Sequence, residues 1–327
     1  MGKIAPPALA ASEVARALAR REALGAPGGA TGTTLARGEG WSVDDVLCTR
    51  GPADRPFEER HEQVSVALVL AGTFQYRGDH GEAMLTPGSI MLGSSGQRFE
   101  CSHEHASGDR CVAFHYDEAL FESILEGAGL STRGAFSVGR LPPLPAFSGI
   151  VAAATCGATR LAAVGWEELA LEVAARAARA VASGGNGAGE TPPRPSRAAL
   201  ARITESVREI ERDPAAARGL GELAARAGSS PYHYLRTFRR ITGVTPHQFV
   251  LRARLRQAAA RVATEPTRII DIALDAGFAD LSNFNRAFRA ELGTSPRRLR
   301  VGGLRFGQGE PASPSGVTGG PAAPSKG

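Results

Sequence analysis

Cysteine and histidine side chains are concentrated in one short part of the chain. Cys101-Ser-His-Glu-His105 and Cys111-Val-Ala-Phe-His115 are separated by only five residues, 106–110. Alternate side chains of an extended strand share a face, so one hairpin would bring these groups together. Thiol and imidazole groups at such spacing suit zinc or another borderline metal, and a thiol pair equally suits redox sensing. The candidate metal or redox residues are Cys101, His103, His105, Cys111 and His115.

Three interpretations of these residues stay open. They hold zinc or another metal, with Cys48 as a further ligand; they form a redox-sensing thiol pair; or they are buried cysteines and surface histidines that share no ligand. Only four cysteines occur in 327 residues, which argues against a disulfide scaffold. The sequence contains no nucleophile elbow, phosphate loop or dinucleotide fingerprint, so we expect neither an enzyme nor a required cofactor.

Short strands punctuated by glycine and proline must position these side chains. Residues 64–70 are an almost wholly apolar run, and Thr86-Pro-Gly-Ser89 is a turn between two further apolar segments. Residues 111–116 predict another strand. Strands at this spacing predict a small barrel or sandwich, and the Ala-rich pattern over 161–182 predicts a helix that closes the domain or pairs two subunits.

Composition divides the chain into two expected domains. Residues 1–38, a linker at 183–195 and a tail at 302–327 are rich in small residues and proline and are expected to be disordered. They leave domains at 39–182 and 196–301. No run of 18 residues is apolar and uncharged, and the N-terminus has no signal-peptide pattern, so we expect a cytoplasmic protein without a membrane span.

The second domain contains the same pattern twice, over about 220–241 and about 268–291. An Ala-Gly pair recurs after 49 residues, and four residues recur after 50, namely Arg236, Phe238, Gly243 and Pro246. Each copy predicts a short amphipathic helix, a turn at a glycine and a second helix, which is the helix-turn-helix layout. The pattern also predicts three helix N-caps, at Ser196, Ser230 and Thr267.

The second helix of each copy has an outward face that suits double-stranded DNA. Arginine can bond guanine or phosphate, asparagine can bond adenine, and an apolar side chain suits the thymine methyl group. The predicted DNA-binding residues are Tyr232, Leu235, Arg236, Arg239, Leu281, Ser282, Asn283, Asn285 and Arg286. Residues 197–300 carry 19 arginines, no lysine and ten acidic residues, although the net charge of the whole chain is only +5. A basic module joined to a mildly acidic remainder is typical of nucleic-acid-binding proteins.

These segments resemble the AraC/XylS family of transcription regulators. The resemblance covers about 197–300, and its strongest part is Gly277-Phe-Ala-Asp-Leu-Ser-Asn-Phe-Asn-Arg-Ala-Phe288 followed by Gly293-Thr-Ser-Pro-Arg-Arg-Leu-Arg300. It implies a seven-helix domain with recognition helices at about 230–241 and 281–291. The first domain is similar to the cupin-like barrel that many such regulators carry, where it binds an effector or mediates dimerisation.

We therefore expect an α+β protein with an N-terminal cupin-like barrel, flanking helices and an all-α DNA-binding domain. Its expected partners are promoter DNA, RNA polymerase, a small-molecule or metal effector and a second copy of the chain. The alternative is a metal- or thiol-dependent barrel, either an enzyme or a responder to alkylation or oxidation, that uses the helical domain as a DNA-targeting arm.

Overall fold

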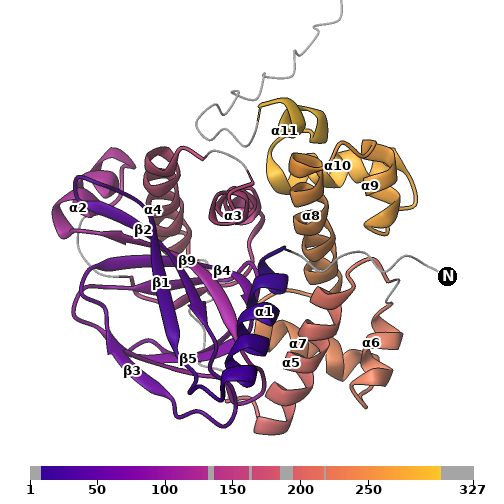
Figure 1. The fold of residues 1–327 in the computed structure, drawn as a ribbon, viewed down its shortest axis with the longest axis horizontal. Helices are drawn as coiled ribbons and strands as arrows, with labels where there is room; N and C mark the ends of the chain where they lie inside the picture. Colours follow the sequence, from indigo (N-terminus) through magenta and orange to yellow (C-terminus); the bar gives the residue numbers. More distant parts are fainter. Residues whose placement is uncertain (1–8, 132–135, 162–163, 185–193, 217–218, 303–327) are drawn as a thin grey trace, which may run out of the picture.

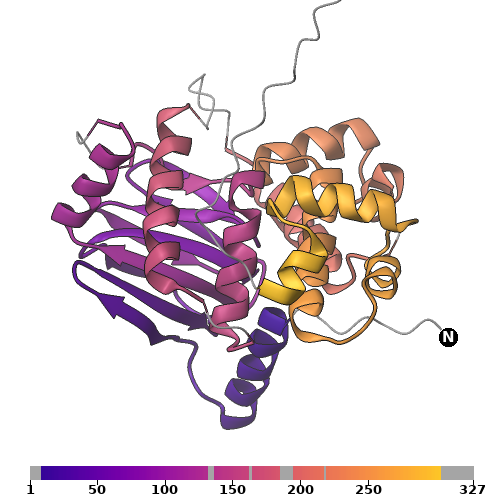
Figure 2. The same ribbon diagram turned by 90° about the horizontal axis from the view of Figure 1, so that it is seen from above.

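The computed structural model describes residues 9–131, 136–161, 164–184, 194–216 and 219–302, and it shows an α+β protein with two regions (Figure 1). The described strands all lie in the N-terminal region, which extends to residue 184, and they are accompanied there by four helices. The C-terminal region begins at residue 194, and its described part consists of helices. The two regions lie side by side in both ribbon views (Figures 1 and 2).

Two antiparallel sheets form the body of the N-terminal region. The first has the strand order β1-β2-β9-β4-β7-β10, and the second has the order β3-β8-β5-β6. The strands are β1 (Ala30–Gly38), β2 (Trp41–Cys48), β3 (Phe57–Arg60), β4 (Val64–Gly72), β5 (Phe74–Gly78), β6 (Gly81–Leu85), β7 (Ile90–Gly93), β8 (Arg98–Ser102), β9 (Asp109–Tyr116) and β10 (Arg140–Leu141). Closure of these two sheets into a barrel stays a prediction.

Strand β4 is buried along nearly its whole length and is almost entirely apolar, because both of its faces are covered. Ala67 and Val69 pack towards the second sheet, whereas Val66 and Leu68 pack towards the helices. The helices of this region are α1 (Leu9–Leu24), α2 (Glu118–Gly127), α3 (Pro145–Ala158) and α4 (Trp166–Ala182). Helix α4 lays its buried face over the first sheet, so the Ala-rich pattern of its sequence is explained by packing within one chain.

The prediction that residues 1–38 are disordered is wrong for residues 9–38, which form α1 and β1. Alanine is the best helix former, and Ala10 and Val14 of α1 are buried against the first sheet. Strand β1 pairs with β2 along its whole length, so its small residues are held by backbone hydrogen bonds. The composition of residues 1–38 indicates neither the packing of α1 on the first sheet nor the pairing of β1 with β2. The predicted linker and tail lie mostly outside the described residues.

Seven helices follow in the described part of residues 194–302, which is the number that the family resemblance implied. They are α5 (Arg197–Arg212), α6 (Leu220–Arg226), α7 (Pro231–Thr242), α8 (Pro246–Thr264), α9 (Ile269–Asp275), α10 (Leu281–Leu292) and α11 (Pro296–Gly302). Ser196 and Ser230 are N-caps as predicted. The predicted cap at Thr267 is wrong: Arg268 precedes α9 without a side-chain cap, and the Thr267 hydroxyl donates to Glu265 instead.

The two regions are joined by apolar packing and by several polar contacts, among them those of Arg140 and Arg252. Met84 of β6 packs in the apolar core that contains Phe238 of α7. Ala152 of α3 packs in the apolar core that contains Phe284 of α10. Arg140 donates to Met84 O at 2.8 Å and to Ile241 O at 2.9 Å. Arg252 donates to Pro143 O at 2.6 Å and forms an ion pair with Glu291 at 3.2 Å. The sequence patterns did not predict this docking.

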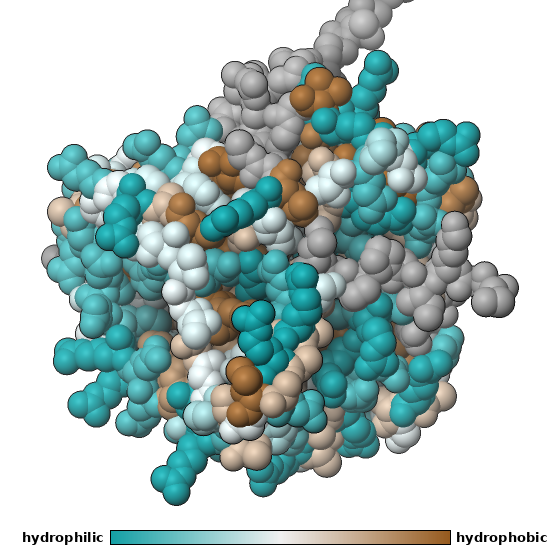
Figure 3. All heavy atoms as spheres, viewed as in Figure 1, coloured by the Kyte–Doolittle hydropathy of each residue, from teal (hydrophilic) through white to brown (hydrophobic). Residues whose placement is uncertain are grey.

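The visible surface of the molecule is mainly hydrophilic, and its hydrophobic residues are scattered (Figure 3). Scattered apolar residues are normal on a protein surface and do not by themselves mark an interface. Within the described part of the chain, no helix combines the length and the apolar character that crossing a lipid bilayer demands.

Candidate nucleic-acid interface and buried side-chain cluster

The first candidate interface is the helix pair α6 and α7. Residues 227–230 join the two helices, and Gly228 has a φ of +59°, a conformation that favours glycine. The Ser230 hydroxyl accepts a hydrogen bond from the His233 backbone, and Pro231 occupies the first turn. Gly243, with a φ of +83°, ends α7. These signals fix where the second helix begins and ends.

Helix α7 separates an inward aromatic stripe from an outward basic face. Tyr234, Phe238 and Ile241 are buried, as their spacing predicts. The predicted DNA-binding residues Tyr232, Arg236 and Arg239 are exposed, with Tyr232 at 69%, and Leu235 is half-buried. The Arg236 guanidinium lies 5.7 Å from the centre of the Tyr232 ring, so the two side chains form one amphipathic surface. Arg240, also exposed, lines a cleft beside the N-terminal region.

The second candidate interface is the helix pair α9 and α10. Five residues, 276–280, join these helices, one more than in the first pair, as the two recurrence distances predict. Phe284, Phe288 and Leu292 are buried. Of the predicted DNA-binding residues, Ser282, Asn283 and Arg286 are exposed, whereas Leu281 and Asn285 are half-buried. Arg289 is also exposed.

Asn283 is engaged locally, which its sequence position did not reveal. Its side-chain amide donates to the Asp280 carboxylate at 2.6 Å, and its backbone N–H donates to the same carboxylate at 2.7 Å. Asp280 is therefore the N-cap of α10, and Asn283 helps to hold that cap. Asn285 and Arg286, two and three residues further along, take no part in this arrangement.

Comparison with known proteins assigns the helical region to a family. The family described as "Helix-turn-helix domain" matches residues 223–301. The regulatory protein SoxS of Salmonella typhimurium is 33% identical over 78 residues, which cover 24% of this chain and 73% of SoxS. The transcriptional activator AarP of Providencia stuartii is 34% identical over 82 residues, which cover 25% of this chain and 61% of AarP. The chain belongs to the AraC/XylS family of transcription regulators.

The matches cover only part of several relatives. The chain spans less than two-thirds of AarP, and 34% of the regulator MtrA of Neisseria gonorrhoeae. Among solved structures, the DNA-binding domain of AdpA in complex with a target DNA is 29% identical, with a TM-score of 0.30, over 30% of this chain and 89% of that domain. ToxT from Vibrio cholerae is 13% identical, with a TM-score of 0.34, over 80% of this chain and 98% of ToxT.

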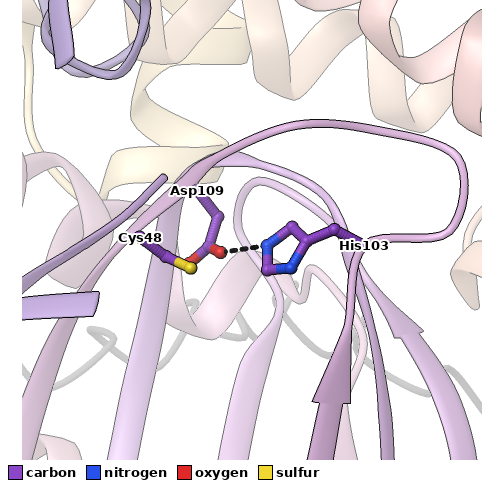
Figure 4. A group of neighbouring side chains, drawn as sticks. All are labelled: Cys48, His103 and Asp109. Atoms are coloured by element: carbon purple, nitrogen blue, oxygen red, sulfur yellow. Dashed lines mark hydrogen bonds and ion pairs between the residues drawn. The ribbon is translucent and has the colours of Figure 1, made fainter. Parts of the chain in front are cut away.

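A buried cluster lies at one end of the sheets, distant in sequence from the helix pairs (Figure 4). Cys48 ends β2, His103 follows β8, and Asp109 begins β9; their side chains offer ligand atoms that all lie within 4.8 Å of one another. His103 Nε2 lies 2.6 Å from Asp109 Oδ1. Cys111 Sγ donates to Asp109 Oδ2 at 3.5 Å. We call Cys48, His103, Asp109 and Cys111 the β-end cluster.

The β-end cluster corrects the sequence-based grouping. His103 and Cys111 belong to it, and Cys48 joins as foreseen, but Asp109 was not predicted. Cys101, His105 and His115 do not belong to the group of converging ligand atoms, and Cys111 is linked to that group only through its contact with Asp109. The His115 ring lies 3.6 Å from Asp44, and His61 is buried against Phe99. A strand rises by about 3.3 Å per residue, so residues four apart on one strand are more than about ten ångströms apart. A hairpin cannot bring both of them to the same ion.

Burial sets the protonation of the thiols. Burial, followed by the nearby Asp109 carboxylate, raises the pKa of Cys48 to about 12. The same two causes raise the pKa of Cys101 and of Cys111 well above the usual thiol range. Burial alone raises the pKa of Cys156, on α3, to about 11. All four cysteines are free and buried thiols.

A cleft of about 720 Å³ lies between the second sheet and the helical region. Its walls include Tyr76 and Met84 from the sheet side and Arg240 and Ile241 from α7. Arg140 lies at its base and bridges the two regions through the bonds described above, and burial lowers the pKa of its guanidinium to about 10. The cleft therefore touches α7 directly.

Proposed function

We propose that this protein is a sequence-specific transcription regulator that binds promoter DNA through two helix-turn-helix units, α6–α7 and α9–α10. The observation that carries the proposal is that both second helices bury an aromatic stripe and leave arginines exposed. Membership of the AraC/XylS family supports the same function. The known relatives described above are named regulators or activators, so an enzyme with a DNA-targeting arm is not favoured.

The outward residues divide into two groups by chemistry. Arg236, Asn285 and Arg286 lie in the middle of their helices and are suited to the edges of bases, where arginine pairs with guanine and asparagine with adenine. Arg239 and Arg289 lie a turn further along and are suited to phosphates, which position a protein without reading sequence. Half-buried Leu235 and Leu281 would add contacts with thymine methyl groups.

Promoter binding by single-residue variants tests this assignment. We expect Arg236→Ala and Arg286→Ala each to weaken binding to the specific site by roughly 1–3 kcal/mol, and to weaken binding to random DNA much less. Arg98→Ala removes the same charge from an exposed position on β8 and serves as the matched control. Equal loss of affinity in all three variants, or in none, would contradict the assignment.

We propose further that residues 9–182 form a sensor domain with a cupin-like barrel, joined through 183–195 to the DNA-binding domain at 196–301. The cleft supports a small-molecule effector site, because an occupant would contact the second sheet and α7 together. Filling the cleft by Ala83→Trp should abolish the thermal stabilisation and the change in promoter affinity caused by a true effector. An effector that acts undiminished on this variant would bind elsewhere. RNA polymerase and a second copy of the chain stay predictions as partners.

A further inference from the structure

We propose that the β-end cluster is a zinc site, in which Cys48, His103, Asp109 and Cys111 supply the ligands. This inference is independent of the DNA-binding function, because none of these four side chains belongs to the two helix pairs. It also differs from the sequence-based set of candidate ligands, since Cys101 and two histidines leave the set and a carboxylate enters it.

The donor set matches the coordination chemistry of zinc. Structural zinc sites take four ligands from thiolate, imidazole and carboxylate groups, with bonds of roughly 2.0–2.3 Å. Such bonds place neighbouring ligand atoms about 3.3–3.8 Å apart in a tetrahedron. The ligand atoms of Cys48, His103 and Asp109 converge within 4.8 Å. Cys111 Sγ is outside this group of three but lies 3.5 Å from Asp109 Oδ2, so its side chain must move towards the other two ligands to become the fourth. The short contact between His103 and Asp109 must lengthen by less than one ångström to admit the ion.

The burial of the cluster suits a bound cation. Cys48, His103 and Asp109 are 4%, 4% and 6% exposed, and Cys111 is 7% exposed. A carboxylate, an imidazole and two thiols removed from water together are costly unless they are paired or bind a metal. A divalent cation would offset the charge of Asp109 and the thiolates at one point.

The backbone around the cluster is closely packed, which preorganises the ligands. Gly72 and Gly108 both have positive φ values, and the Gly72 backbone passes so close to Gly108 O that a Cβ at Gly72 would clash with it. Asp109 and Cys111 are neighbours on β9, which is hydrogen-bonded to β2 with Cys48 paired to Asp109. Preorganised ligands are what a specific metal site requires.

Metal binding explains the cluster better than redox sensing does. Redox-sensing cysteines are accessible and have thiolate character, whereas deeply buried thiols in apolar surroundings are inert. Cys48 and Cys111 are buried, and neither lies at a surface that an oxidant can reach directly. In contrast, a metal ion deprotonates the thiols that coordinate it. The ion would enter as the region folds, since ligand binding and folding are coupled in such sites.

Metal titration of the full chain tests this proposal, and its readout does not involve DNA. We expect the protein to bind one zinc ion per chain, measured by elemental analysis and by competition with a chromogenic chelator. Cobalt in place of zinc should give thiolate-to-metal charge-transfer absorption and the intense visible bands of tetrahedral coordination. Cys48→Ser and His103→Gln should each weaken zinc binding by about 100-fold or more, since loss of even an outer partner costs roughly 10–100-fold.

Cys156→Ser is the matched control, because Cys156 is a buried thiol on α3 outside the cluster. It should bind zinc like the unchanged protein, and circular dichroism should show that all variants are folded. A wild-type chain that takes up no stoichiometric zinc or cobalt would overturn the proposal. So would undiminished zinc binding by Cys48→Ser, or a disulfide between Cys48 and Cys111 as the product of mild oxidation of the metal-treated protein.

Discussion

The helical region and the sheet region carry their candidate sites in opposite ways. On α7 and α10 the candidate residues lie on the outside of a regular helix, and the buried stripe beneath them only holds the helix in place. In the β-end cluster the candidate residues are themselves buried and come from the ends of β2, β8 and β9. The difference shows that an exposed helical site is a local property of sequence, whereas a buried site between strands depends on the whole fold.

The sharpest test of this contrast compares the two faces of α10. Phe288 is fully buried, and Phe288→Ala should lower the free energy of unfolding by about 3–5 kcal/mol, because it removes a packed aromatic ring. Arg286, on the outer face, is exposed, and Arg286→Ala should change stability by no more than about 0.5 kcal/mol. Urea denaturation measures both. Similar losses in the two variants would mean that the outer face also serves packing.

Acid should act on the sheet region through His61. Burial, and then the neighbouring His115, lower the pKa of His61 to about 4, from 6.5 in an exposed histidine. The unfolded chain therefore binds a proton that the folded chain does not, so the stabilisation is complete above the unfolded pKa and is lost as pH falls. Between about pH 7 and pH 5 the protein should lose about 2 kcal/mol of stability through this group.

Two variants isolate this contribution. His61→Gln should reduce the acid sensitivity of unfolding, measured as the change in urea midpoint between the two pH values. His80→Gln, at an exposed histidine, should leave that sensitivity as it is. If both variants behave alike, the acid response arises elsewhere in the molecule.

Helix caps give a smaller effect that sharpens the comparison between the two helix pairs. Ser230→Ala and Asp280→Ala each remove a side chain that accepts a backbone hydrogen bond, so each should cost about 1 kcal/mol of stability. Thr267→Ala should cost much less, because Thr267 does not cap α9. Thermal unfolding of the three variants distinguishes them. If Thr267→Ala lost as much stability as the other two variants, Thr267 would cap α9 after all, as the sequence pattern predicted.

The limits of prediction from sequence follow from the same contrast. The periodicity of Tyr234, Phe238 and Ile241 predicted which face of α7 is buried, because neighbours on one helix face are fixed by the 3.6-residue repeat. Asp109 could not be recognised as a cluster member, since its partner Cys48 is 61 positions away in the chain and meets it only through the pairing of β2 with β9. The helix α1 was missed because its burial against β4 is likewise a long-range contact.

The docking between the two regions could not be predicted from the sequence either. Arg140 and Arg252 resemble any other arginine in an arginine-rich chain, yet both donate to backbone carbonyl groups across the boundary. Asn283 shows the reverse case: its position predicts an outward amide, but the side chain is held by Asp280. Local patterns therefore predicted exposure well, and they predicted the partners of polar side chains poorly.

Base-preference profiling by selection from random DNA tests the central claim most directly. If α7 and α10 read separate segments of one site, Arg236→Ala should relax the preference at one end of the bound sequence. Arg286→Ala should relax it at the other end, roughly 10 base pairs away, and each should leave the rest of the profile unchanged. Profiles in which both variants lose the same positions, or in which neither loses any, would contradict the account.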